Sequence, residues 1–192
     1  MKIGVLALQG AFIEHIKMLR QLGFEAVEVR LPHQLDRLDG LIIPGGESTT
    51  IGKLASEYGL IAPLRRFART RPTWGTCAGM IFLAKDIGID EQPILGAMDI
   101  TVDRNAFGRQ IDSFETDLQI AGLAGAPFHA VFIRAPVVTA VEPGVDVLAR
   151  LDDGRIVAVR QGRLLATAFH PELTDDLRLH ASFCDIVKGT LD

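Results

Sequence analysis

The sequence predicts a doubly wound α/β fold, in which a three-layer, mostly parallel sheet carries a mixed or antiparallel extension. Two observations predict it. Up to about residue 85, apolar strand-like runs alternate with amphipathic helix-like segments, as in a parallel sheet covered on both faces. From about residue 97 the pattern changes to short, closely spaced strands separated by hairpin turns such as Asp152-Asp153-Gly154-Arg155.

Hydrophobic periodicity and helix-breaking residues delimit the elements of the first part. Residues 2–8 form an almost wholly apolar run, which is typical of a strand buried on both faces. Residues 11–22 place apolar side chains at helical spacing before Gly23, a common helix terminator. By the same criteria we expect strands at 25–31, 40–43 and 73–75, and helices at 49–58, 61–70 and 78–85.

The second part is predicted to be mainly β. We expect short strands at 97–102, 113–120, 129–133, 137–141, 147–151, 155–159 and 164–169, and a final helix at 175–188. No linker or repeat divides the chain, so residues 1–192 are predicted to form one domain.

Composition excludes several classes of protein. With 48% hydrophobic and 23% charged residues, the chain can bury a core and is not disordered. A net charge of −4 offers no basic surface for nucleic acid or an anionic membrane, and no apolar run is long enough to span a bilayer. The two cysteines, Cys77 and Cys184, form neither a disulfide framework nor a zinc cluster. We therefore expect a cytoplasmic protein with no metal, nucleic acid or membrane partner.

The first chemical motif is Gly75-Thr76-Cys77-Ala78-Gly79, which lies between an expected strand and an expected helix. This G-x-C-x-G pattern is that of a nucleophile elbow with sulfur in place of oxygen. Small flanking residues allow the tight turn, and the helix N-terminus favours the thiolate. The alternative is a small buried cysteine at a strand–helix junction.

The second motif is Phe169-His170-Pro171-Glu172 at the end of an expected strand. Residues two apart in extended backbone point the same way, so Glu172 could orient the imidazole of His170. His170 could then accept a proton from Cys77. The alternative is a His-Pro turn that caps a strand, with Glu172 as the solvated start of the last helix.

The remaining histidines and the second cysteine lack such a setting. His15, His33 and His180 fall on helices or in a turn, and His129 opens a strand with no adjacent carboxylate in the sequence. We expect these four to be surface or packing residues. Cys184 is expected to be a small buried apolar residue.

The third motif is Pro44-Gly45-Gly46-Glu47-Ser48-Thr49, directly after a buried strand. It lacks the lysine of a phosphate-binding loop, and Glu47 would repel a phosphate. Its glycines suit an oxyanion hole, with the N–H groups of Gly46 and Ala78 as donors. The alternative is an ordinary glycine-rich turn in which Ser48 or Thr49 is the N-cap of the next helix.

Together, the three motifs resemble those of the class I (triad) glutamine amidotransferases, whose fold is flavodoxin-like. The resemblance is strongest to one subfamily, the glutaminase subunit of pyridoxal 5'-phosphate synthase, and extends over essentially the whole chain. Ala106 stands where this subfamily more often has serine. The matching segments are residues 6–10, 41–50, 75–79, 104–110, 132–136 and 169–174.

The resemblance implies a function and a set of site residues. Cys77, His170 and Glu172 match the catalytic triad of a glutaminase, which hydrolyses L-glutamine to L-glutamate and ammonia without a metal or an organic cofactor. The ammonia passes to a separate synthase subunit, a (β/α)8 barrel, for vitamin B6 (pyridoxal phosphate) biosynthesis. The positions that match glutamine-binding residues are Gly46, Glu47, Ser48, Arg104, Ile133 and Arg134.

Arg104 and Arg134 each follow a strand-like segment, where a cation could meet the carboxylate of an amino acid; the alternative is that both are surface charges. Gln9 and Gly10 end the first strand at the same sheet edge as Cys77, so we expect them to face the synthase partner. Two other functions remain open: a peptidase or amidase that acts alone on other γ-glutamyl compounds or amides, and a non-catalytic binding module that has kept the fold.

Overall fold

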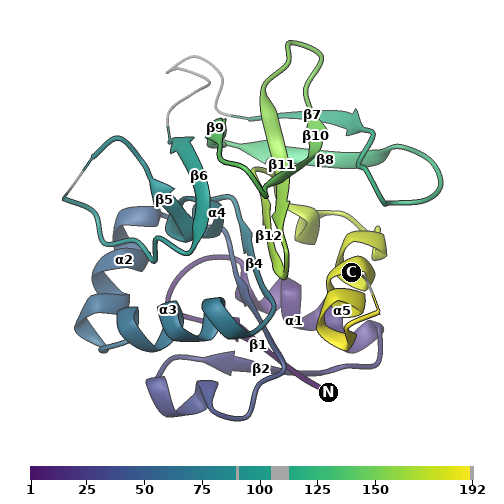
Figure 1. The fold of residues 1–192 in the computed structure, drawn as a ribbon. Helices are drawn as coiled ribbons and strands as arrows, with labels where there is room; N and C mark the ends of the chain where they lie inside the picture. The colour runs from purple at the N-terminus through teal and green to yellow at the C-terminus, as the bar shows by residue number, and fades with distance from the viewer. Residues whose placement is uncertain (90, 105–112, 191–192) are drawn as a thin grey trace.

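The computed structural model describes residues 1–89, 91–104 and 113–190. Its centre is a row of five parallel strands in the order β2-β1-β3-β4-β12 (Figure 1). The first four of these strands follow the flavodoxin-like order, in which the chain reverses direction across the sheet between β1 and β3. The strands are β1 (Lys2–Leu6), β2 (Glu25–Val29), β3 (Gly40–Ile43), β4 (Thr73–Thr76) and β12 (Leu164–Thr167).

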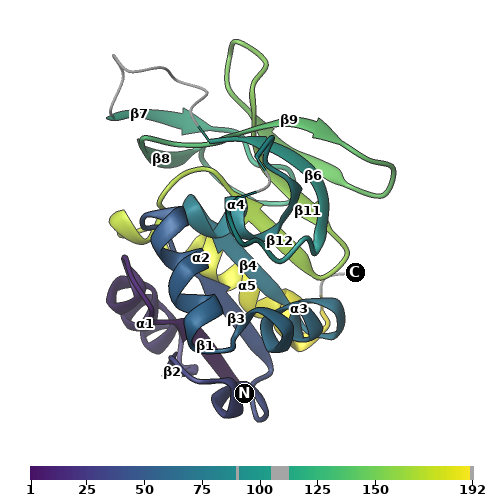
Figure 2. The same ribbon diagram turned by 90° about the vertical axis from the view of Figure 1, so that its left-hand side faces the viewer.

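Helices cover both faces of this sheet, which confirms the predicted three layers. Helices α1 (Phe12–Gln21) and α5 (Arg178–Lys188) contact each other on one face, and α2 (Ser48–Glu57) and α3 (Ile61–Thr70) lie on the other (Figures 1 and 2). The short helix α4 (Ala78–Leu83) follows β4 and is wholly buried. One continuous hydrophobic core fills the space between the layers and includes the fully buried Trp74.

The predicted mixed extension continues the same sheet beyond β12. Strand β11 (Ile156–Gln161) pairs antiparallel with β12, β9 (Val137–Val141) and β10 (Asp146–Arg150). Strand β9 pairs antiparallel with β6 (Met98–Asp103), and β6 pairs parallel with β5 (Ala84–Asp86). Strands β7 (Ser113–Leu118) and β8 (Phe128–Ile133) form a separate antiparallel pair that lies above the main sheet in Figure 1.

The structure corrects several element boundaries. The helix expected at 78–85 ends at Leu83, because the next three residues pair with β6 as strand β5. The strand expected at 164–169 ends at Thr167, and the last helix begins at Arg178. A short 3-10 helix, η1 (Pro32–Leu35), was not expected. Residues 105–110, which carry part of the family resemblance and include Ala106, lie outside the described residues.

Among the described residues, no helix combines the length and the hydrophobicity that crossing a bilayer requires.

Candidate active site

Cys77 occupies a strained turn between β4 and α4. Its φ of 48° lies in the region that favours glycine, and a conformation of this kind costs on the order of 1–3 kcal/mol. A Cβ on Gly79 would lie 1.9 Å from the carbonyl oxygen of Ile43, and one on Gly75 would lie 2.4 Å from that of Gly79. The Cys77 N–H donates to Thr167 O at 2.8 Å, which ties the turn to β12. The G-x-C-x-G segment therefore adopts the strand–turn–helix geometry of a nucleophile elbow.

His170 and Glu172 follow β12 at the same edge of the sheet. The His170 Nδ1 and Glu172 Oε1 atoms are 2.7 Å apart, and the two side chains are 10% and 0% exposed. With Nδ1 engaged by the carboxylate, Nε2 is the nitrogen that remains for proton exchange with Cys77. The structure thus brings the three expected residues together as thiol, imidazole and carboxylate.

The local conformation around Glu172 differs from both sequence interpretations. Glu172 is buried, so the alternative of a solvated helix start is wrong. It lies in the 3-10 helix η2 (Pro171–Leu173) rather than in extended backbone. The contact with His170 therefore arises because the chain turns back at Pro171.

The electrostatics of His170 favour its charged form. Burial alone would lower the pKa of His170, but hydrogen bonds to Cys77 and Glu172, with the negative charges of both, raise it to about 10. At neutral pH His170 is therefore held in its charged form beside the thiol of Cys77.

The glycine loop after β3 packs directly against these residues. A Cβ on Gly45 would lie 2.4 Å from His170 Cε1 and 3.3 Å from Cys77 Cβ, so only glycine allows this approach. The Glu47 N–H donates to Gln9 Oε1 at 2.7 Å, and Ala11 N donates to Gly45 O at 3.3 Å. The loop that follows β1 therefore holds the glycine loop in place.

Glu47 is the N-cap of α2, so the alternative in which Ser48 or Thr49 has this role is wrong. Its carboxylate accepts hydrogen bonds from the backbone N–H groups of Thr49 at 2.9 Å and Thr50 at 2.7 Å. Its slight burial would raise the pKa of Glu47, but hydrogen bonds from Thr50 and Thr49 lower it to about 2. The group is thus a fixed negative charge at the rim of the site.

These elements enclose a cavity of about 400 Å³. All the predicted triad, oxyanion and substrate-binding residues line it except Glu172, which lies behind His170. Gln9 lines it too, whereas Gly10 packs behind it against Gly45 O. The lining residues are Gln9, Gly46, Glu47, Ser48, Cys77, Ala78, Ile81, Arg104, Ile133, Arg134 and His170.

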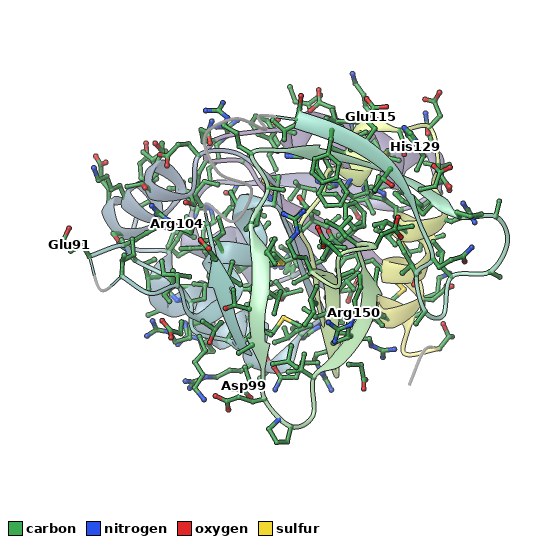
Figure 3. All side chains as sticks on the ribbon, turned by 90° about the horizontal axis from the view of Figure 1, so that it is seen from above. Glu91, Asp99, Arg104, Glu115, His129 and Arg150 are labelled. Carbon is green, nitrogen blue, oxygen red and sulfur yellow. The ribbon has the colours of Figure 1, made fainter. Side chains whose placement is uncertain are left out.

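Two arginines bring positive charge to this cavity. Arg104 follows β6 and donates from Nη1 to Gln92 Oε1; Figure 3 labels it. Arg134 follows β8 with a positive φ of 42°, and the carbonyl oxygen of its neighbour Ile133 lies 3.9 Å from Cys77 Sγ. Two cations and the carboxylate of Glu47 around one cavity are complementary to a small zwitterion. Both arginines line the cavity, and Arg134 is at the same time exposed at the surface.

Sequence reasoning missed two buried polar residues next to the site. Gln92 is 6% exposed and contacts Ser48, Thr49 and Arg104, but it lies in an irregular loop where no pattern marks it. His15 is fully buried, and its Nε2 lies 3.4 Å from Glu172 Oε2. Its position on the apolar face of α1 was the signal available in the sequence.

The surroundings of His129 also differ from the expectation. The strand β8 pairs with β7 so that Asp117 lies opposite His129, and Glu115 lies two residues away on the same face. Both carboxylates are 2.9 Å from an imidazole nitrogen, and Figure 3 places Glu115 and His129 close together at the surface. Within the described part of the chain, no group of three or more His, Cys, Asp or Glu residues could hold a metal ion.

Known proteins match the chain over nearly its whole length. The SNO glutamine amidotransferase family matches residues 5–188. A pyridoxal 5'-phosphate synthase subunit PdxT from Herpetosiphon aurantiacus is 63% identical over 95% of this chain and 98% of its own length. The protein of the same name from Moorella thermoacetica is 58% identical over 97% of this chain and 100% of its own length. A crystal structure described as a glutamine amidotransferase is 54% identical, with a TM-score of 0.91 over 97% of this chain and 98% of the other.

Proposed function

Because the chain belongs to the SNO glutamine amidotransferase family, we propose that Cys77, His170 and Glu172 are the triad with which it hydrolyses L-glutamine to L-glutamate and ammonia. One observation carries the proposal: the thiol of Cys77, in a strained turn, and the imidazole of His170, which a buried carboxylate orients, line the same cavity. We further propose that residues 1–192 form a single glutaminase domain.

The first half of the reaction forms a thioester. The thiolate of Cys77 attacks the side-chain carbonyl carbon of glutamine, and the carbonyl oxygen becomes an oxyanion. The N–H groups of Gly46 and Ala78 donate to that oxyanion; the N–H of Ala78 is suited to this role because the first residues of a helix have no intrahelical acceptor. The imidazolium of His170 protonates the amide nitrogen, the C–N bond breaks, and ammonia leaves.

The second half regenerates the enzyme. Neutral His170 removes a proton from water, and the resulting hydroxide attacks the γ-glutamyl thioester. The bond to Cys77 Sγ breaks, glutamate is released, and the thiolate and imidazolium form again. Glu172 keeps Nδ1 protonated throughout, so that Nε2 is the atom that accepts and donates the proton.

Substrate recognition follows from the charges around the cavity. Arg104 and Arg134 can pair with the α-carboxylate of glutamine, and the fixed negative charge of Glu47 attracts its α-ammonium group. Ser48 and the backbone at Ile133 supply polar groups to the cavity that would hold glutamine. Because Cys77 lines the same cavity as these charges, we propose that the side-chain amide is the part of glutamine that reaches it.

We propose that the ammonia passes to the synthase subunit, a (β/α)8 barrel, of a pyridoxal 5'-phosphate synthase. The relatives in Herpetosiphon and Moorella are named as subunits of that enzyme. Gln9 and Gly10 follow β1 at the sheet edge where Cys77 lies, and we place the docking surface around them. The reaction is assigned to the cytoplasm, because Cys77 must remain a free thiol.

The test is a titration of the purified chain with its synthase subunit while ammonia and glutamate are measured. We expect low glutaminase activity from the chain alone and a rise that saturates at a fixed ratio of the two subunits. Equal activity with and without the synthase would instead favour an amidase that acts alone. Substitution of Gln9 by alanine should weaken the stimulation; unchanged complex formation and stimulation would remove Gln9 from the docking surface.

The Gly45→Ala substitution should lower turnover of glutamine by about 100-fold, because the new methyl group displaces the imidazole from its position beside Cys77. The measurement is glutaminase activity in the synthase complex, with the melting temperature recorded in parallel. Gly59→Ala is the matched control: nothing lies within 4 Å of the position that its Cβ would take, and its φ of +67° makes the change costly for stability only. Normal turnover in Gly45→Ala would contradict the proposed contact.

A further inference from the structure

A pair of buried histidines lies behind the carboxylate of Glu172. His15 on α1 and His180 on α5 are both completely buried, and His15 Nδ1 is 2.8 Å from His180 Nε2. The other nitrogen of His15, Nε2, lies 3.4 Å from Glu172 Oε2 and 3.3 Å from Thr76 Oγ1. A chain of polar contacts therefore runs from His180 through His15 and Glu172 to His170. His15, His180 and Glu172 do not line the cavity.

His15 and His180 are both neutral. Burial, with the nearby His180 and His170, lowers the pKa of His15 well below its usual value, and burial lowers the pKa of His180 to about 3. A neutral imidazole carries one N–H, so each ring has one donor and one acceptor nitrogen. Only two arrangements of these protons are compatible with a hydrogen bond between the rings.

In the first arrangement both rings carry the proton on Nε2. His180 then donates to Nδ1 of His15, and the Nε2–H of His15 donates to Thr76 Oγ1 at 3.3 Å, with Glu172 Oε2 3.4 Å from the same nitrogen. Glu172 Oε2 has no hydrogen-bond partner among the described residues, and in this arrangement the Nε2–H of His15 is a donor beside it, while Oε1 accepts from His170 Nδ1. Among the described residues the one ring atom left unpaired is His180 Nδ1, which in this arrangement is a bare acceptor.

In the second arrangement the protons lie on both Nδ1 atoms. A lone pair of His15 would then face the carboxylate, and within the described part of the chain Glu172 Oε2 would have no donor. The Nδ1–H of His180 would be buried with no acceptor, which is rarer and more costly than an unpaired lone pair. The first arrangement is therefore the favoured one.

We propose that His15 is a positioning residue of the triad: its Nε2–H, fixed in direction by His180, holds one oxygen of Glu172 so that the other stays on His170. The proposal rests on the proposed function, because it assigns a role within that reaction. The contact of 3.4 Å is not itself a hydrogen bond in this structure, and formation of that bond requires the Nε2–H to turn from Thr76 Oγ1 to Glu172 Oε2. Since His15 touches no substrate, its loss should change turnover and not binding.

The tautomers can be read directly by long-range ¹H–¹⁵N NMR spectra of the ¹⁵N-labelled chain in complex with its synthase subunit, with His15→Gln and His180→Phe used to assign the signals. We expect both rings to be neutral with the proton on Nε2. An Nδ1–H or a charged ring at His15 would overturn the proposal. This readout does not depend on turnover, so a wild-type complex that fails to hydrolyse glutamine would contradict the proposed function alone.

The kinetic test compares two substitutions at the same site. His15→Leu removes the donor, and we expect kcat in the complex to fall by about 10–100-fold, the range seen when an outer partner of a site residue is lost, with KM for glutamine unchanged. His15→Gln can present an amide N–H to Glu172 and a carbonyl to His180, and should recover most of kcat. Equal losses in the two variants would mean a packing role and would overturn the proposal.

Two further variants keep the test decisive. Leu64→Ala removes buried volume from α3, away from the histidines, and should lower the melting temperature while kcat is retained. If His15→Leu does not fold, His180→Phe replaces it: His15 remains but loses the group that fixes its proton. We expect a mixture of tautomers at His15 and a lower kcat in that variant; an unchanged tautomer together with an unchanged kcat would overturn the proposal.

Discussion

Replacement of Cys77 by alanine should abolish the release of glutamate and ammonia, with a loss of about 10⁴-fold or more, as when the nucleophile of a triad is removed. The reason is that no other described group with the reactivity of a thiolate opens onto the cavity. Alanine keeps the Cβ at this strained position, so the fold and its melting temperature should change little. The measurement is glutamate production by the variant in complex with the synthase subunit.

Cys184→Ala is the matched control for this loss. Cys184 is 1% exposed, and burial raises the pKa of its thiol to about 12, so it is an inert packing residue. Turnover in this variant should equal that of the unchanged chain. Substantial residual turnover in Cys77→Ala, or a comparable loss in Cys184→Ala, would refute the assignment of the nucleophile.

Glu172→Gln should lower kcat by about 10²–10⁴-fold, because it keeps the size of the side chain and removes the charge that orients the imidazole. Without this carboxylate one of the causes that raise the pKa of His170 to about 10 is lost, so that pKa falls. A histidine with a raised pKa is protonated until the pH rises through that pKa, and the alkaline limb of the pH–rate profile should therefore move to lower pH.

The surface of the same chain provides the control. Asp117 and His129 are 2.9 Å apart, like Glu172 and His170, but they are exposed and have no thiol beside them. Asp117→Asn should leave kcat and its pH profile unchanged. If Glu172→Gln behaved as Asp117→Asn does, the carboxylate would have no part in the reaction.

The parts of the site that the sequence predicts are those set by local geometry. The small residues around Cys77 are needed for one tight turn, and His170 and Glu172 are only two residues apart, so both motifs can be read without the fold. That Cys77 and His170 come together follows from a general property of parallel sheets, because the carboxyl ends of their strands lie at one edge. Even here, the contact between His170 and Glu172 depends on a 3-10 helix that begins at Pro171, whereas the sequence prediction assumed extended backbone.

The parts that the sequence does not predict depend on pairing between distant segments. Ala84 and Lys85 were expected to continue the helix, and with Asp86 they become a strand only because β6 lies beside them. The carboxylates around His129 come from the register of β7 on β8, which no local pattern specifies. His15 shares the apolar face of α1 with Ile16 and Leu19, which predicts burial, but its contact with Glu172 requires the packing of α1 against η2.

The central claim is that Cys77 is the nucleophile that glutamine reaches. The most direct measurement is peptide mapping by mass spectrometry after the complex has reacted with a glutamine analogue that carries an electrophile on its side chain. We expect one label, on Cys77, that excess glutamine prevents and that Cys184 does not acquire. An unlabelled Cys77, or a label there that glutamine does not block, would contradict it.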